Sequence, residues 1–159
     1  VDTLGILPVV ASFEHHLKYD SSGYPRLPLL RKQHIASSII SICDVYDALS
    51  QRRSYKQDYP PDMVYNIMNR NEGGSFDPQL LDKFFKFIGL WPVGSVVALN
   101  DGSIALVKDE NESDIRRPKV EIVSPAEKRR SIDLAQDNSL SIERYLNPWK
   151  EGKEFLHLV

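Results

Sequence analysis

The sequence has little of several features that would decide its class at once. It contains one cysteine, Cys43, so no disulfide can form within the chain, which suits a reducing cytoplasm. Its formal net charge is −2, so no excess of one sign points to a nucleic acid polymer or an acidic membrane as partner. No apolar run approaches the roughly 20 residues that cross a bilayer, and no signal-peptide pattern opens the chain. We therefore expect a cytoplasmic protein segment without a membrane span.

What the sequence does have is enough apolar material for a real core. Apolar residues make up 42% of the 159 residues, a length typical of about one domain. The chain begins with Val1 instead of methionine and runs almost directly into the helix-like stretch LPVVASFEHH. From this beginning we expect the sequence to be part of a larger protein.

The first part of the chain has the periodicity of helices. Between His34 and Gln51, apolar residues recur every three or four positions, which is the stripe of a long amphipathic helix. Prolines and acidic caps mark other helix starts, at Pro60-Pro61 and at Asp77-Pro78. A loop rich in glycine and proline separates the first two helices. The predicted helices cover approximately residues 6–16, 34–51, 61–72 and 78–88.

After Trp91-Pro92-Val93-Gly94 the periodicity changes. The stretch SVVALNDGSIALV places two apolar runs around Asn100-Asp101-Gly102, which predicts a tight hairpin. KVEIV alternates like a further strand, whereas the charged stretches 108–117 and 127–130 are interpreted as solvated loops and SIERYLNP as a short helix or turn. The predicted fold is mainly α, with helices over residues 1–90 and a small antiparallel β appendage with a short C-terminal helix over residues 91–159.

The stretch EHHLKYDSSGYP carries the first candidate chemistry. Histidine is a common metal ligand, and here His15 and His16 are adjacent. Neighbouring residues on a helix point about 100° apart, so the pair suits two neighbouring ions, or one ion and a substrate, better than a single ion. An ordinary surface pair at a helix end explains the same residues. Both interpretations stay open on these two residues alone.

Two acidic residues on the long helix bear on that choice. Asp44 lies in SICDVYDALS, on a helix with an apolar face, where an unpaired buried charge is costly. This favours a partner such as a metal ion for Asp44. Asp47 lies three residues further on the same face and is better explained by solvent, a local backbone contact or an arginine.

Residues that suit a nucleotide occur on both sides of this helix. Arg53 and Lys56 follow its end, and such cations bind phosphate but are also frequent at helix C-termini. Tyr24 lies between Gly23 and Pro25, so its ring is held on a constrained turn. That ring suits stacking on a base, or equally a place in the core.

Together these motifs resemble the C-terminal half of an HD-GYP domain, a subgroup of the HD superfamily of metal-dependent phosphohydrolases. The family pattern His-His-Glu-x-x-Asp-Gly-x-Gly-Tyr-Pro is similar to residues 15–25, Asp-x-x-Asp-Ala-Leu to residues 44–49, and Arg-x-Tyr-Lys to residues 53–56. Phe-Asp-Pro at residues 76–78 and Pro-Val-Gly at residues 92–94 also fit the family. The order and spacing of several separate motifs make the resemblance specific.

The resemblance covers roughly residues 1–125 and implies an HD-type helical bundle from a bacterium. It implies hydrolysis of cyclic di-GMP at two or three divalent ions, iron or manganese. The implied metal ligands are His15, His16 and Asp44. The implied nucleotide and phosphate contacts are Gly23, Tyr24, Pro25, Arg53 and Lys56.

The sequence also departs from the family. It has no His-Asp pair, and its other histidines are His34, at a predicted helix start, and His157, near the end of the chain. Leu17 replaces the family's glutamate, and Ser21 replaces the first glycine of the turn. We expect the intact protein to hydrolyse cyclic di-GMP, and this chain alone to be inactive, with an absent or incomplete metal site. The alternative is a degenerate, non-catalytic signalling module that binds a ligand or a partner, such as a diguanylate cyclase or a response regulator.

Overall fold

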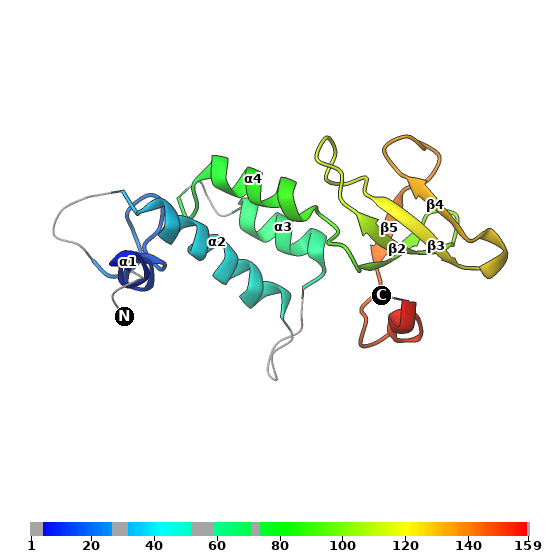
Figure 1. Ribbon diagram of the computed structural model, residues 1–159, viewed down its shortest axis with the longest axis horizontal. Helices are drawn as coiled ribbons and strands as arrows, with labels where there is room; N and C mark the ends of the chain where they lie inside the picture. The colour runs from blue at the N-terminus through cyan, green and yellow to red at the C-terminus, as the bar shows by residue number, and fades with distance from the viewer. Residues whose placement is uncertain (1–4, 27–31, 52–58, 71–73, 159) are drawn as a thin grey trace. The chain divides into compact units, whose positions relative to one another are not determined.

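The computed structural model describes residues 5–26, 32–51, 59–70 and 74–158. These residues form two compact units, one made of residues 1–59 and 63–84 and the other of residues 60–62 and 85–159. Figure 1 shows the helices of the first unit in blue to green and the sheet of the second in green to orange.

Four helices form at the predicted places. They are α1 (Leu7–Glu14), α2 (Ile35–Ser50), α3 (Pro61–Arg70) and α4 (Pro78–Ile88). The predicted N-cap of α4 is confirmed, because Asp77 Oδ1 accepts the N–H groups of Gln79 and Leu80 at 2.9 and 3.2 Å. Within the described ranges, no helix has both the length and the apolar character needed to traverse a bilayer.

The helices of the first unit pack through a small apolar core. Helix α1 packs against α2, and the ring of Tyr46 on α2 meets the edge of Phe84 on α4 with the ring centroids 5.2 Å apart. The buried apolar side chains of this unit are Ala11, Leu17, Ile42, Val64, Met68, Phe76 and Leu81. Leu17 belongs to the loop after α1, so its burial with the helix residues holds this loop close to the helices.

The second unit is a five-stranded antiparallel sheet in the order β4-β3-β2-β1-β5. The predicted hairpin is confirmed, since Val97 of β1 lies opposite Ala105 of β2 and Gly102 in the turn has φ +80°. The predicted strand KVEIV is also confirmed, as β3. The strands are β1 (Val96–Leu99), β2 (Ile104–Asp109), β3 (Lys119–Ser124), β4 (Arg130–Asp133) and β5 (Ile142–Tyr145).

The sheet has its own core and its own polar clamp. Val96, Ala98, Leu106 and Leu146 form a buried apolar cluster. Arg117 donates from Nε to the carbonyl of Leu134 at 2.6 Å, and from Nη2 to the carbonyls of Asp137 and Leu140 at 2.8 and 3.0 Å. One guanidinium thus satisfies three main-chain acceptors in the connection between β4 and β5.

The fold class is mixed α/β, so the expectation of a mainly α fold was wrong. Two strands were missed: β4 begins in the charged stretch taken for a solvated loop, and β5 lies in SIERYLNP, taken for a short helix or turn. Both are the outer strands of the sheet. Edge strands are short and often charged, which protects them from pairing with other chains, and this hides their alternation in the sequence. Two 3₁₀ helices, η1 (Ala126–Lys128) and η2 (Lys153–Leu158), complete the unit.

Candidate functional site

His15 lies at the C-terminal end of α1 with its ring oriented by the helix itself. Its Nδ1 contacts the carbonyl oxygens of Ser12 at 2.8 Å and Ala11 at 3.2 Å. Because a carbonyl oxygen only accepts, Nδ1 carries the proton and the lone pair is left on Nε2. Metal-binding histidines are commonly fixed by a main-chain hydrogen bond of this kind. In the half-buried His15, Nε2 therefore has the free lone pair that binding of a cation requires.

His16 is exposed and lies between two other rings. Its ring centroid is 4.0 Å from that of His15 and 4.6 Å from that of Tyr24, with an angle of 31° between the His16 and Tyr24 planes. The N–H of Tyr24 also donates to the carbonyl of His16 at 3.3 Å. Tyr24 remains 61% exposed, so its ring is not part of the core. An aromatic surface thus stands directly beside the paired imidazoles.

The turn that carries Tyr24 depends on two unusual backbone positions. Leu17 and Gly23 form an antiparallel bridge, and Gly23 has φ +91°. A Cβ at Gly23 would overlap the carbonyl oxygen of His16, so only glycine fits. Ser21, where the family has glycine, adopts φ +67°, a conformation that costs a non-glycine residue about 1 kcal/mol. The following peptide bond, Tyr24–Pro25, is cis.

Asp20 fastens this turn to the segment before α4. Its Oδ1 accepts the N–H of Ser22 at 2.9 Å, and its own N–H donates to the carbonyl of Gly74 at 2.9 Å. Hydrogen bonds from the Ser22 side chain and backbone hold the pKa of the Asp20 carboxyl below its ordinary value. A Cβ at Gly74 would overlap that carboxylate. Asp20 therefore acts in the structure as an ionised brace of the turn.

Glu14 is a residue of this region that the sequence interpretation missed. It is completely buried, and its Oε2 accepts the N–H of His34 and the hydroxyl of Ser37, both at 2.9 Å. Its main-chain carbonyl accepts the side-chain amide of Gln33 at 2.9 Å. The available signal was a carboxylate within the apolar run LPVVASFE, directly before the two histidines. Leu17, in the place of the family's glutamate, is instead a core residue, 2% exposed.

The two aspartates on α2 differ in their surroundings. Asp47 Oδ1 accepts the side-chain amide of Gln51 at 2.6 Å, so among the described residues its partner is a glutamine side chain and not the backbone or an arginine. Asp44 is exposed on α2, so its charge is not buried among the apolar residues of that helix. His34, predicted to start this helix, is confirmed as its N-cap, because its Nδ1 accepts the N–H of Ala36 at 3.1 Å.

The structure brings part of the predicted site together. The end of α1 and the turn that follows it bring five of the predicted residues close together: His15, His16, Gly23, Tyr24 and Pro25. Among the residues described, no three side chains of histidine, cysteine or acidic type are grouped as a metal site. His15, His16 and Asp44 have the donor atoms that iron or manganese accepts, but the structure does not group these three side chains as a metal site. Arg53 and Lys56 lie outside the described residues.

A known protein family matches the region of the chain that contains these residues. The pattern of the HD domain family matches residues 9–80, which include both histidines and Asp44. A cyclic di-GMP phosphodiesterase of Pseudomonas aeruginosa is 30% identical over 117 residues, or 73% of this chain and 28% of that protein. A match of that length cannot fit within the first 80 residues, so it includes part of the sheet unit.

Two further relatives match a shorter part of the chain. A cyclic di-GMP phosphodiesterase of Thermotoga maritima is 32% identical over 72 residues, covering 45% of this chain and 20% of that protein. A 3′3′-cGAMP-specific phosphodiesterase of Vibrio cholerae is 35% identical over 68 residues, covering 43% of this chain and 13% of that protein. This chain thus spans less than a third of the length of each of these relatives. No solved structure matches it with comparable significance. Residues 9–80 thus match the HD domain family, and the chain is homologous to cyclic di-GMP phosphodiesterases.

Proposed function

We propose that this chain is part of a bacterial metal-dependent phosphodiesterase that hydrolyses cyclic di-GMP. The Pseudomonas and Thermotoga relatives are both cyclic di-GMP phosphodiesterases, and the HD domain match covers the stretch that holds the paired histidines. The observation that carries the proposal is the hydrogen bond from His15 Nδ1 to the carbonyl of Ser12, because it leaves Nε2 as a free ligand atom.

In this proposal, His15, His16 and Asp44 each contribute one ligand to a cluster of iron or manganese ions, with further ligands from outside these three. Cleavage of a phosphodiester needs an activated water and positive charge beside the phosphate, which divalent metal ions supply. The chain's own contribution is orientation. The helix fixes the tautomer of His15, and contact with His15 and Tyr24 fixes the ring of His16.

The same turn is proposed to hold the nucleotide. The exposed ring of Tyr24 offers a flat face to a guanine base, and Gly23 and Pro25 set its position. Arg53 and Lys56 are proposed to contact the phosphates, since both side chains provide positive donors for anionic oxygen. The base would then stack on the exposed ring of Tyr24, directly beside the paired imidazoles.

The direct test is turnover by the full-length protein that carries this sequence. It is assayed with manganese or ferrous iron against cyclic di-GMP and linear pGpG, as wild type and as His15→Ala. We expect wild-type hydrolysis of cyclic di-GMP and a loss of at least about tenfold in His15→Ala, because even residues that only support a metal ligand contribute about 10–100-fold. His157→Ala is the matched control and should keep full activity. Equal turnover in wild type and His15→Ala would refute the proposal.

A second candidate function is a non-catalytic module of the same fold that binds a ligand or a signalling partner. It is favoured by Leu17, a core residue where the family has a glutamate, and by the strained backbone of Ser21. A diguanylate cyclase or a response regulator is the kind of partner this role implies. Wild-type protein that retains cyclic di-GMP without cleaving it, or a Tyr24→Ala variant that loses a protein partner while keeping its metal, would select this alternative.

A further inference from the structure

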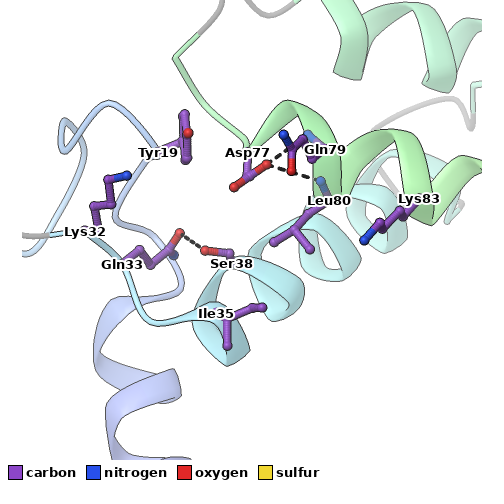
Figure 2. A pocket seen from close by; sticks show the side chains of 9 residues that line it. All are labelled: Tyr19, Lys32, Gln33, Ile35, Ser38, Asp77, Gln79, Leu80 and Lys83. Carbon is purple, nitrogen blue, oxygen red and sulfur yellow. Dashed lines mark hydrogen bonds between the residues drawn. The ribbon is translucent and has the colours of Figure 1, made fainter.

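The helical unit contains a pocket that the phosphodiesterase proposal does not use. Its volume is about 290 Å³, close to the lower end for small-molecule sites. It opens among the start of α2, the start of α4 and the loop after α1, as Figure 2 shows. The lining residues used below are Lys32, Ile35, Asp77, Gln79, Leu80 and Lys83. None of the proposed metal or nucleotide ligands lines this pocket.

Two lysines give the pocket its charge. Lys32 precedes α2 and Lys83 lies on α4, and Figure 2 shows their ammonium groups turned toward the pocket from opposite sides. Within the described part of the chain, neither ammonium takes part in an ion pair or a hydrogen bond. By contrast, lysines of the sheet unit such as Lys119 and Lys128 are paired with aspartates. The two pocket lysines therefore remain available to an anion.

The single acidic residue of the pocket does not neutralise them. Asp77 uses Oδ1 to accept the N–H groups of Gln79 and Leu80, so this carboxylate serves as the cap of α4. Two ammonium groups against one carboxylate leave the lining with net positive charge. The start of α2 is likewise capped, by His34 Nδ1. Attraction for an anion thus comes from the lysines and not from open helix ends.

We propose that this pocket binds a phosphate group, either free phosphate or the terminal group of a phosphomonoester. A phosphate carries up to two negative charges near neutral pH, which matches two cations on opposite sides of a small cavity. The side chain of Gln79 adds a neutral donor, and Ile35 and Leu80 provide an apolar wall beside it. The inference goes beyond the phosphodiesterase proposal and does not depend on it, since neither lysine has a part in that proposal.

The test is a calorimetric titration of the 159-residue chain at low salt with inorganic phosphate, guanosine 5′-monophosphate and guanosine. We expect saturable binding of the monophosphate, of phosphate, or of both, and none of guanosine. Binding of phosphate indicates a site for the free ion, and binding of the monophosphate alone indicates a site for its ester. Replacement of both lysines (Lys32→Ala with Lys83→Ala) should weaken binding at least tenfold. The charge-matched control, Lys150→Ala with Lys153→Ala, should leave binding unchanged.

A single substitution separates anion binding from folding. Gln79→Glu places a carboxylate in the pocket but also in the first turn of α4, where negative charge stabilises a helix. We expect at least tenfold weaker phosphate binding with an unchanged or higher melting temperature. No saturable binding by wild type, equal binding of guanosine, or full binding by the double lysine variant would each overturn the proposal.

Discussion

The buried carboxylate of Glu14 accepts a hydrogen bond of 2.9 Å from the hydroxyl of Ser37 and so joins the end of α1 to the first turn of α2. The same oxygen accepts the N–H of His34 at 2.9 Å. His15 and His16 directly follow Glu14, and α2 carries Asp44. The placement of the proposed ligands relative to one another therefore depends on a buried side chain that is not proposed as a ligand.

Replacing Glu14 by alanine should destabilise the helical unit strongly. The change removes the acceptor of two hydrogen bonds, one from the buried hydroxyl of Ser37 and one from the part-buried N–H of His34. Leaving buried hydrogen-bond donors without their acceptor costs roughly 3 kcal/mol of unfolding free energy. Urea unfolding measures the change. Glu14→Gln, which keeps one acceptor oxygen, should cost less, and Glu112→Ala, an exposed control, should cost almost nothing. Equal stability of Glu14→Ala and wild type would contradict this role.

Gly23→Ala should disrupt the turn that supports Tyr24. The residue has φ +91°, and an added Cβ would overlap the carbonyl oxygen of His16. We expect a loss of about 2 kcal/mol or more, measured by thermal unfolding. Gly102→Ala is the matched control, because Gly102 has φ +80° but open space around the added Cβ. It should show only the backbone cost of about 1 kcal/mol. If the two variants lost the same stability, the overlap at Gly23 would have no effect.

The stability of the same turn should depend on pH through Asp20. Hydrogen bonds from Ser22 lower the pKa of Asp20 in the folded state from its ordinary value of 3.8. A lowered folded-state pKa means that ionised Asp20 stabilises the fold above pH 3.8, and that this contribution is lost as the pH falls through the folded-state pKa. The melting temperatures of wild type and Asp20→Ala should therefore differ at neutral pH and converge in acid. A difference that stayed constant or widened toward low pH would contradict the assignment.

Tyr24→Ala should weaken substrate binding in the full-length protein without removing metal. The ring is exposed and lies beside His16, so its loss removes a stacking surface and leaves the imidazole nitrogens in place. Stacking of one base on an aromatic ring contributes about 1–3 kcal/mol, which corresponds to a rise of roughly fivefold to 150-fold in KM for cyclic di-GMP. Tyr24→Phe keeps the ring and should behave nearly as wild type. An unchanged KM in Tyr24→Ala would show that this ring does not contact the base.

The sequence predicted those parts of the structure that local rules decide. The helix α2, the Asp77 cap and the hairpin at Gly102 each follow from residues close in the chain, and all three are confirmed. The apolar stripe predicted for α2 is not its buried face, because Ile35 and Ile39 are exposed and Ser37 and Ser41 are buried. The outer strands β4 and β5 were missed because their polar side chains lack the alternation of a half-buried strand. Their pairing is decided by the strands beside them, which is a tertiary effect.

In the candidate site too, the sequence predicted the relationships between residues close in the chain and missed those between distant residues. The paired histidines, Gly23 and Tyr24 are neighbours along the chain, so their spacing in the sequence indicated that they lie close together. The role of Glu14 was not visible, because its partners His34 and Ser37 lie 20 and 23 residues away. The pocket between Lys32 and Lys83 also joins segments that are distant in the sequence. Such relationships arise only when the helices pack.

The central claim, that His15, His16 and Asp44 share a metal cluster, is tested most directly by metal content. The full-length protein is purified as wild type, His15→Ala, Asp44→Ala and the control His157→Ala, and its iron and manganese are counted by mass spectrometry. The account predicts two or three ions per chain in wild type and the control, and the loss of at least one ion in each of the other variants. Unchanged metal content in Asp44→Ala and His15→Ala would contradict it.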